Sequence, residues 1–308
     1  LLERGGNIIF DDNAAQAKKL SNISKKRKLK KYNFGQNSFI RIIDIQKLND
    51  QKKVFFSINN KQYSFKTSLI GKIQIKNLIF AIVAAYLSKI KIRDILKIIN
   101  KIKPVSGRLE NIGNIRNNSK VILDYAHTPD ALKTAILNIK ENYPLSRISL
   151  VFGCGGNRDK NKRSIMGKIA NAYCEKIYLT DDNPRNERPD LIRDQIKKRM
   201  KKNKFVEIAS RAKAISSAVN ELSSGDVLIV AGKGHETYQE YKQKKFFSDK
   251  VEILKSINKK NLYLTKSIKT NILNENLKNY VINEDKIINF ASINSKKINK
   301  NSLFIGVK

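Results

Sequence analysis

Between residues 108 and 259 the chain alternates short runs of Val, Ile and Leu with longer amphipathic runs. Short β-branched runs favour strands buried on both faces, and the longer runs have the periodicity of helices. Repeated strand–helix units predict an α/β fold with a mostly parallel sheet that helices cover on both faces. The expected strands are 121–123, 147–152, 176–180, 205–208 and 227–230, and the expected helices are 129–141, 159–174, 189–201 and 211–222.

A polar motif follows each of four expected strands. Because ligands of open parallel sheets bind at the carboxyl ends of the strands, we expect these motifs to form one site. They are Asp124 to Asp130, Gly153 to Arg163, Asp182 to Arg185 and Ala231 to Glu236.

The turn Asp182-Asn183-Pro184-Arg185 is the most specific of these motifs. Pro184 fixes the backbone, and the planar guanidinium of Arg185 matches a carboxylate with two parallel hydrogen bonds. Glu236 would accept a hydrogen bond from an amine of the same ligand. Together they predict a pocket for a small zwitterion, whereas a plain glycine turn with a solvated lysine is the alternative for 231–236.

The glycine-rich motif suits an anion. Gly153 to Gly156 let the backbone approach a ligand, and Arg158 and Arg163 add positive charge. The loop does not fit the Walker pattern, which ends in Gly-Lys-Ser/Thr. A simple tight turn is the alternative.

The motif after the first of these strands has two interpretations that hold together. Asp124 and His127 would hold a ribose hydroxyl or a phosphate, while helix capping explains Thr128 and Pro129. Neither histidine has metal-ligand neighbours in the sequence, and no Ser-His-Asp or Cys-His set is present. We therefore expect no metal site and no nucleophilic hydrolase.

The net charge of +35, from 62 Lys and Arg against 27 Asp and Glu, is typical of proteins with a nucleic-acid or anionic partner. Here, however, Lys is spread through almost every polar segment together with Asn and Ile, and these three residues share A/T-rich codons. No basic stripe interleaved with aromatic residues is present. The pattern favours a solvated basic surface and no nucleic-acid partner, and a nucleic-acid-binding protein remains the rival class.

Length and cysteine content indicate a cytoplasmic protein of more than one domain. A chain of 308 residues can form two cores, and its two cysteines have neither metal-like nor disulfide-framework spacing. The longest apolar stretch, 78–87, is too short to span a bilayer, so no membrane partner is expected. The chain begins without Met and stops within a strand-like run, 303–307, so we expect a fragment cut at both ends.

The flanking segments differ from the central one. Residues 1–106 predict a hairpin turned at Asn59-Asn60, and the break at 104–107 predicts a domain boundary. In the tail, 260–308, two short runs are strand-like. The expected strands are 39–43, 54–58, 62–65, 280–282 and 303–305, and the expected helices are 77–89 and 92–102.

In their order, these motifs resemble the Mur ligase family, and within it the members that add diaminopimelate. The resemblance runs from about residue 7 to residue 258. It implies the C-terminal portion of a central ATP-binding domain over 1–106 and a Rossmann-like, amino-acid-binding domain over 107–259. The matching stretches are 106–110, 124–130, 152–163, 180–185, 232–239 and 248–249.

The resemblance also implies an activity. Such enzymes use ATP and Mg²⁺ to join meso-diaminopimelate to a UDP-N-acetylmuramoyl dipeptide through an acyl phosphate, in peptidoglycan biosynthesis. Members that add lysine differ at 182–185 and remain the alternative. By resemblance, Arg158, Asp182, Asn183, Pro184, Arg185, Gly232 and Glu236 would bind diaminopimelate, and Asn77, Arg108, Asp124 and His127 would bind ATP.

Two further implications concern the ends of the chain. The phosphate loop and the carbamylated lysine lie upstream of residue 1 in relatives, so we expect no catalytic residue here and no activity of the fragment alone. Residues 291–307 resemble the opening of a family member that adds D-alanyl-D-alanine, although Asn294-Ser295-Lys296 stands where relatives carry Asp-Ser-Arg. Residues 260–308 would then be a linker and the start of a second, fused ligase; an appended basic tail is the alternative.

Overall fold

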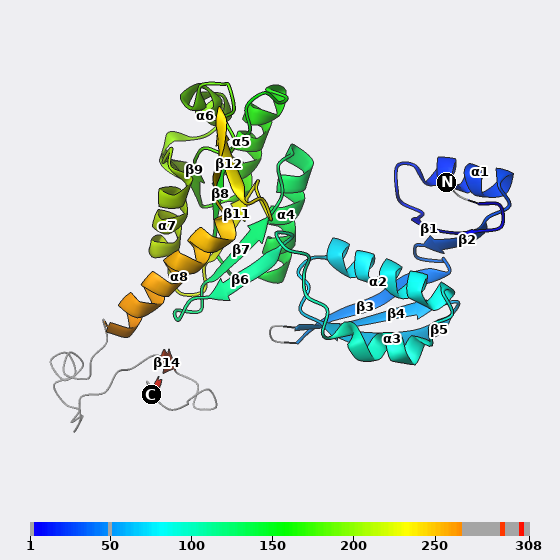
Figure 1. Cartoon of the computed structure of the whole chain (residues 1–308). Helices are drawn as coiled ribbons and strands as arrows, with labels where there is room; N and C mark the ends of the chain where they lie inside the picture. The colour runs from blue at the N-terminus through cyan, green and yellow to red at the C-terminus, as the bar shows by residue number, and fades with distance from the viewer. Residues whose placement is uncertain (1–2, 49–50, 267–289, 293–301, 305–308) are drawn as a thin grey trace. The chain divides into compact units, whose positions relative to one another are not determined.

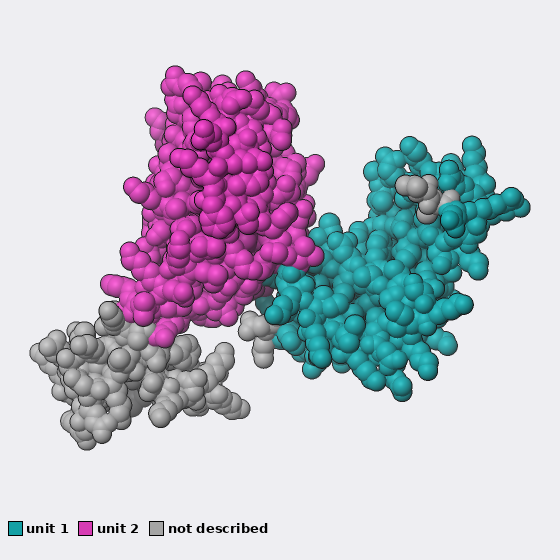
Figure 2. Space-filling model, in the orientation of Figure 1, with its two compact units in different colours: residues 1–104 teal, residues 105–308 magenta. Residues whose placement is uncertain are grey.

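The computed structural model describes residues 3–48, 51–266, 290–292 and 302–304 (Figure 1). Contacts divide the chain into two compact units, residues 1–104 and 105–308, which Figure 2 colours teal and magenta. No helix in the described part is both long and apolar enough to cross a bilayer.

The first unit is built on a five-stranded mixed sheet. The first three strands are parallel neighbours, and the last two add antiparallel. The predicted hairpin turn is confirmed, because Asn59 and Asn60 both take positive φ, 47° and 60°, as primed turns require. In spatial order the strands are β1 (Asn7–Asp11), β2 (Lys30–Phe34), β3 (Ile40–Leu48), β4 (Gln51–Ile58) and β5 (Lys61–Thr67).

Three helices belong to this unit. Helix α1 (Ala17–Lys26) connects β1 to β2 and was not predicted. Helices α2 (Lys72–Leu87) and α3 (Ile92–Ile99) share a core with β3, β4 and β5. Helix α2 begins at Lys72, five residues before its predicted start, and Gly71 with φ of 88° is its N-cap. The helix extends this far because its polar-looking first turns still bury Ile75.

The second unit confirms the predicted mostly parallel sheet. It has six strands, of which only β6 at one edge runs antiparallel to its neighbour. Strand β11 lies between β8 and β7, although it follows both of them in the sequence. The connection from β10 to β11 therefore runs back across the sheet. In spatial order the strands are β10 (Phe205–Glu207), β9 (Lys176–Leu179), β8 (Ile148–Phe152), β11 (Val227–Ala231), β7 (Lys120–Asp124) and β6 (Glu110–Asn114).

Helices cover both faces of this sheet (Figure 1). Alternate strand residues such as Leu228 and Val230 pack with α7 and α8, while Ile229 between them points to the other face. The other face carries α4, α5 and α6, which lie side by side. The helices are α4 (Pro129–Asn142), α5 (Asn161–Tyr173), α6 (Pro189–Lys197), α7 (Arg211–Glu221) and α8 (Asp249–Lys266).

Short strands complete the described chain. The hairpin of β12 (Tyr238–Tyr241) and β13 (Gln243–Phe246) follows the last motif and was not predicted. Strands β14 (Phe290–Ser292) and β15 (Ser302–Phe304) pair in parallel, which confirms a strand at 303–304. The predicted strand 280–282 lies outside the described residues.

Candidate functional site

A pocket of about 540 Å³ lies at the carboxyl ends of β7, β8, β9 and β11. The loops after these four strands meet there because the strands are parallel, as the sequence predicted. Seven of the predicted site residues line it: His127, Arg158, Asp182, Asn183, Arg185, Gly232 and Glu236.

Asn183 and Glu236 are joined across the pocket wall. The Asn183 Nδ2 group donates to Glu236 Oε2 at 3.0 Å, and the Asn183 Oδ1 atom accepts from the Glu240 N–H at 3.0 Å. Lys233 Nζ contacts both side chains, at 2.8 Å from Asn183 Oδ1 and 3.2 Å from Glu236 Oε2. The alternative of a solvated lysine in this turn is wrong, because the Lys233 side chain is fully buried.

Arg185 is held in a demanding conformation. Its φ of 54° is uncommon for a residue other than glycine, and backbone pairing with β12 fixes it: its N–H donates to the Glu240 carbonyl at 2.9 Å. The guanidinium donates through Nη1 to the Gly156 carbonyl at 2.9 Å, and Nε lies 3.2 Å from Glu240 Oε2. The side chain is therefore oriented before any ligand binds.

The glycine-rich loop packs directly against the Asp182–Arg185 turn. A Cβ atom at Gly156 would lie 1.9 Å from the Pro184 carbonyl oxygen, and one at Gly153 would lie 2.2 Å from the Thr180 carbonyl oxygen. Only glycine allows this approach. Pro184 itself is absent from the pocket lining and contacts the loop through this carbonyl.

Arg163 does not serve the anion role that the sequence suggested. Its fully buried guanidinium pairs with Glu187, at 2.9 Å between Nη1 and Oε2, and donates to the Gly155 carbonyl at 3.0 Å. Glu187 Oε1 in turn accepts from the Asn157 N–H at 2.5 Å. Arg163 and Glu187 thus clamp the glycine-rich loop, and the hydrogen bond from Arg163 holds the pKa of Glu187 down at about 2. Arg158 remains exposed and lines the pocket.

Asp124 serves the local structure. Its two oxygens accept from the N–H groups of Leu109 and Ala126, each at 2.8 Å. Burial raises the pKa of Asp124 above 3.8, although these hydrogen bonds oppose the shift. Neither Asp124 nor Arg108 is among the described residues that line the pocket.

Both histidines of the chain flank one tyrosine. The rings of His127 and His235 lie 4.7 and 5.4 Å from that of Tyr125, and the Arg108 guanidinium lies 4.4 Å from the same ring. The predicted capping is confirmed nearby, since Thr128 accepts from the Ala131 N–H and precedes Pro129 at the first position of α4.

The remaining candidate, Asn77, lies on α2 of the first unit, beside Lys76, which pairs with Asp11 at 2.5 Å. Within residues 3–48 and 51–266, no three His, Cys, Asp or Glu side chains gather as a metal site would require.

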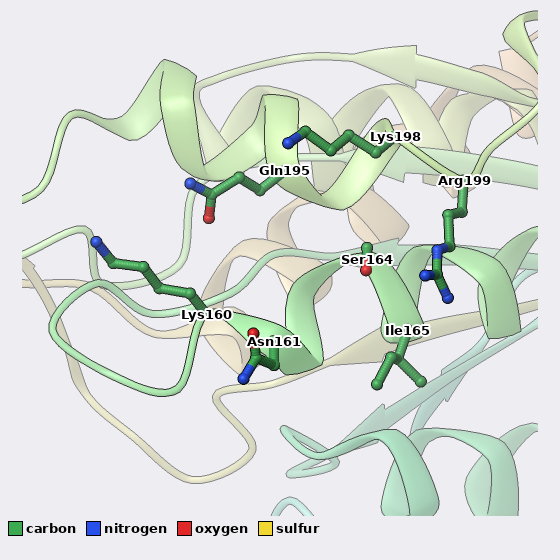
Figure 3. Close-up of a pocket in the computed structure, with 7 residues that line it drawn as sticks. All are labelled: Lys160, Asn161, Ser164, Ile165, Gln195, Lys198 and Arg199. Carbon is green, nitrogen blue, oxygen red and sulfur yellow. The ribbon is translucent and has the colours of Figure 1, made fainter.

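A second pocket, of about 410 Å³, lies between α5 and α6 (Figure 3). Its cations, Lys160, Lys198 and Arg199, are all exposed. In a chain with a net charge of +35, exposed cations gather on many surfaces, so we assign no site there.

Two stretches of the chain match parts of one protein family. Residues 2–85 match the Mur ligase middle domain, and residues 107–234 match the Mur ligase glutamate ligase domain. The chain therefore belongs to the Mur ligase family. All of the residues that line the pocket except Glu236 and Tyr238 lie within the matched glutamate ligase domain.

Its relatives include UDP-N-acetylmuramoyl-L-alanyl-D-glutamate–2,6-diaminopimelate ligase of Rickettsia felis, 39% identical over 258 residues, or 83% of this chain and 48% of that protein. The ligase of the same name from Buchnera aphidicola is 43% identical over 197 residues, 63% of this chain and 39% of that one. A solved structure of that name has 27% identity and a TM-score of 0.60, over 82% of this chain and 53% of that one. The chain thus spans about half the length of the first of these relatives.

Proposed function

We propose that this chain forms the amino-acid-binding part of an ATP-dependent amide ligase that adds meso-diaminopimelate to UDP-N-acetylmuramoyl-L-alanyl-D-glutamate. One observation carries the proposal: a preformed Arg185 and the Asn183–Glu236 pair face one pocket. A guanidinium and a carboxylate in one pocket suit the two charges of an amino acid. The similarity to diaminopimelate ligases supports this ligand.

The pocket favours diaminopimelate over lysine because it has cations for a second carboxylate. Arg158 and Arg185 both line it. Lysine has a single carboxylate, so it would contact only one of the two guanidinium groups. Diaminopimelate could form a charge-assisted contact with each of them.

Substitution of Arg185 tests the proposal. Arg185→Ala should weaken meso-diaminopimelate binding by about 2 kcal/mol or more, measured by calorimetry, since it leaves a ligand carboxylate unpaired. Arg188→Ala is the matched control: this arginine lies three positions away, is 73% exposed and pairs with Asp190, so affinity should not change. Equal affinity of the Arg185→Ala protein would refute the assigned role.

ATP is proposed as the cofactor, and family members that are similar in fold have been solved with ADP. By the family resemblance, Asn77, Arg108, Asp124 and His127 would contact it. When bound, ATP would supply the phosphoryl group that activates the substrate carboxylate. The described residues hold no metal-ligand cluster, so the proposal that Mg²⁺ takes part rests on the family resemblance.

Three further proposals rest on the sequence. The first unit would be part of the ATP-binding domain, and residues 107–259 the amino-acid-binding domain. The tail at 291–307 would open a second ligase that adds D-alanyl-D-alanine; most of these residues lie outside the described part. Because the phosphate loop is not within the chain, residues 1–308 alone should not turn over ATP, and measurable ligation by them would contradict this.

A nucleic-acid-binding function remains the second candidate, and the charge of +35 is the observation that favours it. It predicts tight binding to DNA or RNA with a steep dependence on salt. Such binding, together with no response to diaminopimelate, would replace the ligase proposal.

A further inference from the structure

Lys233 is a fully buried cation beside the pocket, and it does not line the pocket. Its side chain is 0% exposed, although each of its three polar partners lines the pocket. Its Nζ atom lies 2.8 Å from Asn183 Oδ1, 3.2 Å from Glu236 Oε2 and 3.3 Å from Asp182 Oδ1. An ammonium has three N–H donors, so these contacts use all of them.

The Lys233 contact fixes how Asn183 presents its carboxamide. Oδ1 faces two donors, the Lys233 ammonium and the Glu240 N–H. A flipped carboxamide would place its NH₂ group against both donors, which is unfavourable. The Nδ2 group is therefore directed to Glu236 Oε2.

The same contact fixes how Glu236 is presented. Its Oε2 atom accepts from both Asn183 and Lys233, and in the described part of the chain Oε1 has no hydrogen-bond partner. Glu236 can then offer Oε1 to a ligand ammonium without losing its own support.

Lys233 also offsets a concentration of negative charge. Asp182 and Glu236 both converge on its Nζ atom. Arg211 is another buried cation, and it lies close enough to both carboxylates for their charges to raise its pKa. Its guanidinium, however, is committed to Asp249 through two hydrogen bonds of 2.7 Å. Removing Lys233 would leave two carboxylates of low exposure facing each other, and such an arrangement is costly.

We propose that Lys233 is a positioning residue for the amino-acid site: it orients the Asn183 carboxamide and the Glu236 carboxylate that would bind the ligand. This inference rests on the proposed function, because it assumes that Asn183 and Glu236 contact an amino acid. Lys233 acts through these two side chains and touches no ligand itself.

A double-mutant cycle on meso-diaminopimelate affinity tests the proposal, with Kd measured by calorimetry on the full chain. Lys233→Met should weaken binding about 30-fold, and Glu236→Gln about 100-fold. Because Lys233 acts partly through Glu236, the double variant should bind at most about threefold more weakly than Glu236→Gln alone, and this remaining loss is the part that acts through Asn183. A double variant weakened by more than about 300-fold, towards the roughly 3,000-fold product of the two single losses, would overturn the proposal. Unchanged affinity of Lys233→Met would also overturn it.

Lys260→Met is the matched control, because it removes a buried lysine that lies outside the pocket. Lys260 is 7% exposed and donates to the carbonyls of Val219, Asn220 and Leu222 at 2.6 to 2.9 Å. Its loss should lower thermal stability and leave the Kd within about twofold of the original. Equal loss of affinity in this control would show that lost stability alone explains Lys233→Met, and would contradict a positioning role.

Two outcomes separate this inference from the proposed function. If the unsubstituted chain fails to bind meso-diaminopimelate, the function is wrong and the inference falls with it; if it binds but the Lys233 variants bind equally well, only the inference is wrong. If Lys233→Met does not fold, Lys233→Gln carries the same cycle. The amide of the new Gln side chain keeps an N–H donor for Asn183 Oδ1. The double variant of Lys233→Gln and Glu236→Gln should therefore bind meso-diaminopimelate more tightly than the product of the two single losses predicts.

Discussion

Neutralising Glu187 should loosen the glycine-rich loop and remove an acid-sensitive part of the stability. Glu187→Gln keeps the shape of the side chain but replaces the carboxylate that binds Arg163 and the Asn157 N–H. Arg163 is fully buried, so the substitution leaves a buried cation with a weaker partner.

The magnitude follows from the pKa of Glu187. Its hydrogen bond to Arg163 lowers this pKa from 4.5 to about 2, which corresponds to at most about 3 kcal/mol of stability. The Glu187 side chain is 22% exposed, so solvent screening reduces the expected loss to about 2 kcal/mol at pH 7. Because the folded-state pKa is lowered, the stabilisation is complete above pH 4.5 and fades as the pH falls towards 2.

Hydrogen exchange of the amides in β8 and β9 is the appropriate assay, since it reports the opening of the second unit alone. The difference in the free energy of opening between the original and Glu187→Gln proteins should fall at pH 3.5 to roughly 60% of its value at pH 7. Asp194→Asn is the control. The Asp194 side chain pairs with Lys197 and is 51% exposed, so its substitution should change the free energy of opening by less than about 0.5 kcal/mol. A difference below that value for Glu187→Gln, or one independent of pH, would refute the reasoning.

Three other substitutions or reactions follow from the same packing. Gly156→Ala should cost about 3 kcal/mol in urea unfolding, because its Cβ would meet the Pro184 carbonyl oxygen; a loss under 1 kcal/mol would contradict the close approach. Asp249→Asn should cost about 3 kcal/mol by the same assay, since Arg211 is fully buried against it, and a neutral result would contradict this. Burial raises the pKa of both cysteine thiols to about 12, so iodoacetamide at pH 8 should modify neither in the folded protein, as mass spectrometry would show.

The local sequence pattern was sufficient to predict those elements whose residues are almost all apolar. Strands β8, β9 and β11 are nearly continuous apolar runs, and only a sheet covered on both faces buries such runs. Strand β6 (Glu-Asn-Ile-Gly-Asn) and the polar hairpin of β12 and β13 have no such pattern. β12 is fixed instead by tertiary pairing, including a bridge between Tyr241 and Arg185.

The sequence could predict which loops form the site, but not which side chains pair with one another within it. The parallel sheet brings the four motifs together, so Arg185 and Glu236 were found from their positions after strands. Arg163 was expected to face an anion, but Glu187, 24 positions further on, binds it. Burial of Lys233 depends on partners from two separate loops, and no local pattern records that.

The most direct test of the central claim is a calorimetric comparison of meso-diaminopimelate with L-lysine on the unsubstituted chain. Two guanidinium groups at the pocket, those of Arg158 and Arg185, suit a ligand with two carboxylates. We predict that meso-diaminopimelate binds at least about tenfold more tightly, because lysine would contact only one of these two groups. Equal affinities for the two amino acids would contradict the account.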